Sequence, residues 1–165
     1  MPSPVLARGL PPASIILGSL LAHWAVIASA PVVPPLGFLV YLGWRQLRPG
    51  LLPVWAGLPL GLIDDLFSGQ PFGTGVLLWS AAAIAFEIID ARFPWRSYAF
   101  EWLVASGLIL TYMLIGLLLA NVTGGSTALK MIVPQILLSL LFYPVVGRTV
   151  ALCDRLRLLP FREIH

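Results

Sequence analysis

Residues 57–73 have the sequence GLPLGLIDDLFSGQPFG. An apolar run ends there in two adjacent acids, and the stretch from Ser68 to Gly73 supplies dense turn chemistry before a second apolar run begins at Thr74. Gly57, Gly61 and Asp65 are spaced by four residues, so on a helix they form one stripe where another backbone can approach closely. The stretch therefore predicts two apolar helices joined by a tight turn, with two carboxylates beside the turn.

The composition of the whole chain indicates that lipid is the main solvent of these helices. The chain has 165 residues, of which 59% are hydrophobic and 10% charged, and its mean hydropathy is +0.93. An average soluble domain is about 45–50% apolar and about 25% charged, so a water-soluble globular domain is excluded. The single Cys153 excludes a disulfide framework and a multi-cysteine metal site. Nucleic-acid binding is excluded because no basic cluster is dense enough to neutralise phosphates.

Charge-free runs separated by proline and glycine predict an all-α integral membrane protein. We expect residues 1–165 to form a single domain, one bundle of about six transmembrane helices of roughly 20 residues each. The segments at about 33–47 and 51–67 are short or flanked by proline, so a re-entrant or strongly tilted arrangement of either stays open. The predicted spans are about 11–30, 33–47, 51–67, 74–91, 97–121 and 128–153, and a short basic cytoplasmic tail covers 154–165.

The arginines predict the orientation of this bundle, because short loops rich in Lys and Arg stay cytoplasmic. With six spans, one side holds only Lys130. The other side holds Arg8, Arg45, Arg48, Arg92, Arg96, Arg148, Arg155, Arg157 and Arg162. Both termini are therefore predicted to be cytoplasmic. Residues 28–30 (ASA) also resemble a signal-peptide cleavage site, but the preceding run is long enough to span, and we expect the first helix to be retained.

Three interpretations of Asp64 and Asp65 stay open. Carboxylates at membrane depth suggest a function by default, whereas at the outer interface they would be solvated or cap the turn at Ser68 and Gly69. They are interpreted as structural or packing residues, as partner-binding residues, or as a proton or substrate site. An aspartyl protease is disfavoured, because adjacent helical positions point about 100° apart and cannot clamp one water. The only histidines are His23 and His165, so we predict no enzyme, and we assign no catalytic residue, cofactor or metal.

A second cluster of charges lies near the end of the predicted helix 74–91. Glu87 and Asp90 are three residues apart and share a helical face, close to Arg92 and Arg96. This cluster is interpreted either as an interfacial network of ion pairs or as a cytoplasmic contact surface. The tail is interpreted as an anchor to anionic lipid headgroups. Its charged residues are Arg148, Asp154, Arg155, Arg157, Arg162 and Glu163.

Residues 61–73 resemble the bacterial rod shape-determining protein MreD family. Members of this family have a glycine-rich helix ending in an acid, then a Ser-Gly-x-Pro-x-Gly turn and another apolar helix. The size of the chain, its nearly loop-free helical layout and its basic tail are similar as well. The resemblance implies a packing or partner-binding role, and no other role, for six residues of the motif. They are Asp64, Asp65, Ser68, Gly69, Pro71 and Gly73.

The resemblance implies a non-enzymatic scaffold of the bacterial cell-elongation machinery in the inner (cytoplasmic) membrane. Such a scaffold binds MreC directly, and through it MreB, RodA and a penicillin-binding transpeptidase, and so helps to organise lateral peptidoglycan synthesis and rod shape. Membrane lipids would be its other partners.

The MreD family is also similar in fold to the six-helix substrate-binding subunits of energy-coupling-factor transporters, which gives an alternative function. A vitamin-type transporter subunit needs several convergent polar groups, and the predicted spans offer few. They are chiefly Asp64, Asp65, Gln70, Asn121 and Gln135. Stripes of small residues are more frequent and favour contacts with protein over contacts with a ligand.

Overall fold

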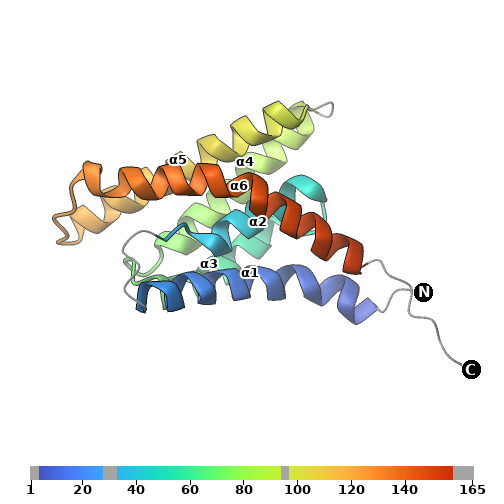
Figure 1. Ribbon diagram of the computed structural model, residues 1–165, viewed down its shortest axis with the longest axis horizontal. Coiled ribbons are helices and arrows are strands. Elements are labelled where there is room, and N and C mark those ends of the chain that lie inside the picture. The colour runs from blue at the N-terminus through green and yellow to red at the C-terminus, as the bar shows by residue number, and fades with distance from the viewer. Residues whose placement is uncertain (1–3, 28–32, 94–96, 158–165) are drawn as a thin grey trace, which may run out of the picture.

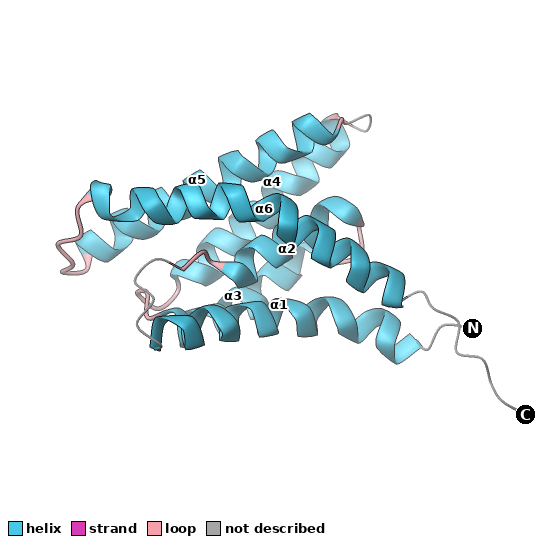
Figure 2. Ribbon diagram, in the orientation of Figure 1, coloured by secondary structure: helices cyan, strands magenta, loops and turns pink. Residues whose placement is uncertain are grey.

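The structure is a computed structural model that describes residues 4–27, 33–93 and 97–157. Over these residues the chain forms six α-helices and one short 3-10 helix, with no strand (Figure 2). The predicted all-α fold is therefore confirmed, and the number of α-helices agrees with the prediction, whereas the prediction that all six are transmembrane is not shown. The elements are α1 (Pro4–Ile27), α2 (Leu36–Leu47), η1 (Val54–Ala56), α3 (Gly57–Ser68), α4 (Thr74–Arg92), α5 (Tyr98–Val122) and α6 (Leu129–Arg157).

Three of these helices can cross a membrane by length and composition. Among the described residues they are α4, α5 and α6, with 19, 25 and 29 residues. In contrast, α2 and α3 have 12 residues each. A helix of that length is about 18 Å long, short of the roughly 30 Å of hydrocarbon in a bilayer. Neither short helix can cross alone, and tilting would only shorten its reach along the membrane normal.

The short helices lie between the long ones. α2 packs against α1 and α6, and α3 packs against α1 and α4. Figure 1 shows α2 and α3 between α1 and α6, with the start of α1 and the end of α6 at the same end of the molecule. The connection between α5 and α6 lies at the opposite end.

An aromatic cluster forms the centre of the core. Phe38 and Tyr41 of α2 meet Trp79 of α4, with ring centroids 5.7 and 5.1 Å from the indole. Tyr112 of α5 stacks on Phe38 at 4.3 Å. Large aromatic rings bury much apolar area per residue, so this cluster joins three helices with few side chains.

The long helices also present apolar side chains on the outside of the molecule. Leu77 of α4, Leu118 of α5 and Leu141 of α6 are all exposed. Contiguous exposed apolar surface is rare on soluble monomers. These faces are compatible with contact to lipid.

Candidate functional site

The two glycines of the predicted stripe pack against α4. A Cβ added to Gly61 would lie 2.5 Å from the backbone oxygen of Gly75, and one added to Gly57 would lie 2.8 Å from that of Trp79. Only glycine permits so close an approach of two backbones. The neighbour that the stripe contacts is therefore α4 of the same chain, and this face of α3 is occupied.

Asp65 continues the stripe and caps the next helix. Its carboxylate accepts backbone N–H bonds from Gly75 at 2.6 Å, Gly73 at 3.0 Å and Val76 at 3.2 Å. The first amides of a helix have no partner within the helix, and they carry a partial positive charge that favours an anion. The alternative in which Asp65 is solvated or caps the turn at Ser68 is wrong, because the side chain is buried and caps the start of α4, which fits its interpretation as a packing residue.

The turn between α3 and α4 presents an aromatic side chain on the surface. Gly69 ends α3 with φ 67° and Gly73 precedes α4 with φ 95°, a left-handed conformation that glycine adopts without strain. The carbonyl of Pro71 accepts the N–H of Thr74 at 3.1 Å. Phe72, at the tip, is 72% exposed. The turn is thus fixed at both ends, whereas the side chain of Phe72 at its tip is largely exposed.

Asp64 points to the other side of α3 and is only 8% exposed, so the expectation of a solvated carboxylate is wrong here too. Its Oδ1 accepts a hydrogen bond from the Ser19 hydroxyl of α1 at 2.7 Å, and its Oδ2 accepts one from the Tyr112 hydroxyl of α5 at 3.3 Å. Buried polar groups are normally hydrogen-bonded. One carboxylate therefore ties three helices together.

Asp64 also lines a pocket of about 110 Å³. The pocket brings together polar side chains from four helices and the turn, among them Ser19, His23, Gln70, Tyr112 and Gln135. From the sequence, Gln70 and Gln135 are predicted only as scattered polar residues of the spans. Ser19, His23 and Tyr112 were not predicted as site residues, because the only signal for them is their polarity within apolar helices.

Asn121 does not join this pocket. Its side chain exchanges two hydrogen bonds with the backbone of Thr127, at 3.0 and 2.9 Å. These bonds close the connection between α5 and α6, where all the residues are exposed. Asn121, in the last turn of α5, therefore holds the following loop and is separate from the group of polar side chains around Asp64.

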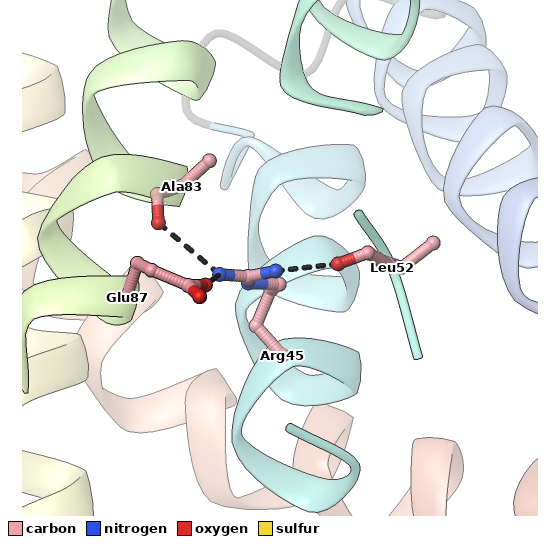
Figure 3. A network of polar contacts seen from close by, with 4 residues as sticks. All are labelled: Arg45, Leu52, Ala83 and Glu87. Atoms are coloured by element: carbon pink, nitrogen blue, oxygen red, sulfur yellow. Dashed lines mark hydrogen bonds and ion pairs between the residues drawn. The ribbon is translucent and has the colours of Figure 1, made fainter. Parts of the chain in front are cut away.

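Arg45 forms a buried network at the other end of α2 (Figure 3). The guanidinium is 1% exposed and donates to the carbonyls of Leu52 at 2.5 Å and Ala83 at 3.1 Å. Glu87 of α4 lies 3.4 Å from it, although this carboxylate is 64% exposed. The Phe86 ring lies 6.0 Å from the guanidinium carbon. Arg45 thus joins α2 to Leu52 through one guanidinium nitrogen and to Ala83 of α4 through another, which the single ammonium group of a lysine could not do with the same geometry.

This network bears on the predicted charge cluster around Glu87. Glu87 forms an ion pair, as one of the two interpretations expected, but its partner is Arg45 of α2. Asp90 is partly buried and Arg92 is exposed. Arg96 lies outside the described residues.

Asp154 forms a second ionic cluster where α2 and α6 end. Arg48 donates to its Oδ2 at 3.0 and 2.7 Å, and Arg157 lies 2.9 Å from its Oδ1. The hydrogen bond from Arg48 and the negative charge of Asp154 raise the pKa of the Arg48 guanidinium. The Arg157 guanidinium also lies 5.9 Å from the ring of Trp44, whose indole N–H donates to Ser14 at 2.8 Å.

The arginines of the predicted lipid anchor differ in their exposure, and the anchor itself stays a prediction. Arg148 and Arg155 are exposed, whereas Arg157 packs inward onto Asp154. Arg162 and Glu163, like residues 28–30 of the possible cleavage site, lie outside the described residues.

The charged groups and the Asp64 pocket lie at opposite ends of the bundle. The ends of α2, α4 and α6 meet through Arg45, Arg48 and Asp154. The start of α5 joins them, since Gln46 donates to the carbonyl of Glu101 at 2.6 Å. The later part of α1, the end of α3 with the turn after it, and the later half of α5 surround Asp64.

The described residues contain no group of three or more His, Cys, Asp or Glu side chains that could hold a metal. Comparisons of the chain with protein-family models, with curated proteins and with solved structures find no match. The resemblances to the MreD family and to transporter subunits therefore rest on the motif at residues 61–73 and on the hydropathy of the chain.

Proposed function

We propose that this chain is a non-enzymatic membrane scaffold of the bacterial cell-elongation machinery that binds MreC. The observation that carries the proposal is the exposed Phe72 at the tip of a turn held by Asp65. A large aromatic side chain on a rigid support loses little conformational freedom on binding, and aromatic residues are frequent hot spots of interfaces. The turn that carries the resemblance therefore holds an exposed aromatic side chain where a partner protein can bind it.

The interior of the motif supports the same function. Gly57 and Gly61 fix α3 on α4, and Asp65 fixes the start of α4, so the residues of the motif act together to hold one turn in place. A turn that binds a partner protein in this way does so without a catalytic group. In the proposal the contact with MreC leads indirectly to MreB, RodA and a penicillin-binding transpeptidase, and so to peptidoglycan synthesis and cell shape.

The membrane arrangement is part of the proposal. α4, α5 and α6 cross the inner membrane, and the chain from α1 to α3 crosses it once more in total, which completes a six-helix bundle of the kind found in energy-coupling-factor subunits. The end with Arg45, Arg48 and Asp154 faces the cytoplasm together with both termini, in accord with the positive-inside rule. The turn with Phe72 then faces outward.

The experiment is recovery of MreC with the intact protein from native membranes in mild detergent. Phe72→Ser should lower the recovery of MreC at least several-fold while leaving the amount of protein in the membrane unchanged. Leu103→Ser, at another exposed apolar side chain on α5, is the matched control and should have no effect. Equal recovery of MreC with wild type and the Phe72 variant would remove this surface from the proposal.

The alternative is a substrate-binding subunit of a vitamin-type transporter. The convergence of Asp64, Gln70 and Gln135 on one pocket favours it. The volume of about 110 Å³ argues against it, since ligand pockets usually enclose about 300–1,000 Å³. Recovery of an ATPase pair with its membrane coupling subunit, in place of MreC, would establish the alternative.

A further inference from the structure

The buried Asp64 carboxylate forms no ion pair with Lys or Arg among the described residues, and the His23 imidazole lines the same pocket. The acids of the ion pairs described above are Glu87 and Asp154, and both lie at the opposite end of the bundle from Asp64. Two hydroxyl donors contact Asp64, whereas Asp65 beside it receives three backbone amides. A buried ionised carboxylate is costly unless a cation pairs with it. Asp64 therefore either carries a proton or takes its counter-charge from a bound cation.

The pocket in front of Asp64 is rich in acceptors. The hydroxyls of Ser19 and Tyr112 donate to Asp64, so their oxygens keep free lone pairs. The buried carbonyl oxygen of the Gln70 side chain has no hydrogen-bond partner among the described residues. Gln135 donates its amide N–H to the carbonyl of Val33 at 2.6 Å, which leaves its own oxygen as an acceptor. A ligand that satisfies these groups must carry hydrogen-bond donors and a positive charge.

The size and position of the pocket restrict the ligand further. A volume of about 110 Å³ accommodates a small headgroup but not a drug-sized molecule. Asp64 lies one helical turn before the end of α3 at Ser68, beside the prolines at 34 and 35. In the proposed membrane arrangement this is the level of the lipid headgroups on the outward side.

We infer that the Asp64 pocket binds a primary ammonium group, supplied by the ethanolamine headgroup of a phospholipid or by a free small amine. The three N–H donors of the ammonium bind Asp64 and the neighbouring oxygens, and its charge neutralises the carboxylate. This inference goes beyond the scaffold role, since it concerns the inside of the bundle and not the turn that presents Phe72, but its phospholipid source rests on the membrane arrangement proposed above.

The test uses the intact protein in phosphatidylcholine nanodiscs and measures the midpoint of thermal unfolding. Ethanolamine should raise the midpoint in a saturable manner. Tetramethylammonium has the same charge but no N–H donor, and it should leave the midpoint unchanged at equal ionic strength. If Na⁺ raises the midpoint as ethanolamine does, the ammonium inference is overturned in favour of a metal cation.

Variants of the pocket residues test whether the stabilisation by ethanolamine arises from binding in the Asp64 pocket. Asp64→Asn keeps the shape but removes the charge, and it should weaken ethanolamine binding roughly ten- to a hundredfold, the range expected for a charge-assisted hydrogen bond. Gln70→Leu leaves the contacts of Asp64 intact and should weaken binding several-fold, which keeps the test valid if the Asp64 variant fails to fold. Glu101→Gln, at the opposite end of the bundle, is the matched control. An ethanolamine effect that survives both pocket variants overturns the inference.

The two sources of the ammonium group, a phospholipid and a free amine, give different changes in the unfolding midpoint. If a phospholipid supplies the ammonium, nanodiscs containing phosphatidylethanolamine should raise the midpoint by themselves, and added ethanolamine should have no further effect. If a free amine is the ligand, ethanolamine should stabilise the protein equally in both lipids. No stabilisation by either source would overturn the inference and would identify Asp64 as a neutral carboxyl group that only joins helices.

Discussion

The carboxylate of Asp65 in α3 accepts the backbone N–H of Gly75 in α4 over 2.6 Å, across the whole turn that separates the two helices. This bond, with those from Gly73 and Val76, makes the end of one helix the cap of the next. Because a helix start that loses its cap exposes unpaired amides to a buried environment, the geometry of the turn depends on this one side chain.

Asp65→Ala is expected to lower the free energy of unfolding by about 2 kcal/mol, the upper part of the range for loss of a helix cap. The measurement is thermal or denaturant unfolding in detergent. Ser97→Ala is the control, because Ser97 caps α5 through a single exposed bond to Phe100 at 3.3 Å, and its loss should cost less. Equal losses for the two variants would show that burial adds nothing to the Asp65 cap.

Gly61→Ala is expected to destabilise the protein by about 1–3 kcal/mol, the usual cost of overpacking. The added Cβ would be placed 2.5 Å from the backbone oxygen of Gly75, and a backbone cannot move aside as a side chain can. Gly107→Ala in α5 is the matched control, since nothing lies within 4 Å of a Cβ there, and alanine favours the helix by up to about 1 kcal/mol. The two substitutions should therefore have opposite signs in an unfolding measurement.

Local signals in the sequence were enough to predict several helix boundaries. The predicted spans 74–91 and 97–121 agree with α4 and α5 to within one residue at each end, because glycine and proline mark these turns directly. α6 continues past the predicted end at 153 to Arg157, since Arg48 and Arg157 hold Asp154 within its last turn. That contact joins residues far apart in the sequence, and no local pattern indicates it.

The partners of the two acids could not be predicted for the same reason. Ser19 and Tyr112 are 45 and 48 residues from Asp64 along the chain, so only the packing of α1 and α5 against α3 brings them together. The spacing of Gly57, Gly61 and Asp65 predicted a close contact of backbones, but spacing cannot identify the neighbour. The burial of Arg45 was missed because a positive charge near a span end is typical of a loop.

Arg45 and Glu87 are expected to contribute unequally, although they form one ion pair. Arg45→Met should lower the free energy of unfolding by about 2–3 kcal/mol, since it leaves the carbonyls of Leu52 and Ala83 without this donor. Glu87→Gln should cost about 0–1 kcal/mol, the range for exposed ion pairs. Unfolding of the two single variants measures the difference. A large effect of Glu87→Gln would mean that the pair is shielded from solvent in the membrane.

Asp154 is expected to be the residue on which the contact between the ends of α2 and α6 depends. It is buried, and two guanidiniums share it: Arg48, whose side chain is 47% exposed, and the nearly buried Arg157. Asp154→Asn removes the negative charge that both guanidiniums contact, so it should cost about 3 kcal/mol, as for other broken buried pairs. Arg48→Gln should have a smaller effect, because Arg157 still pairs with Asp154. The fluorescence of Trp44, which Arg157 contacts, should change with Asp154→Asn and stay nearly constant with Arg48→Gln. Unchanged fluorescence and stability in the Asp154 variant would show instead that the apolar contacts of Val150 and its neighbours hold α6 in place.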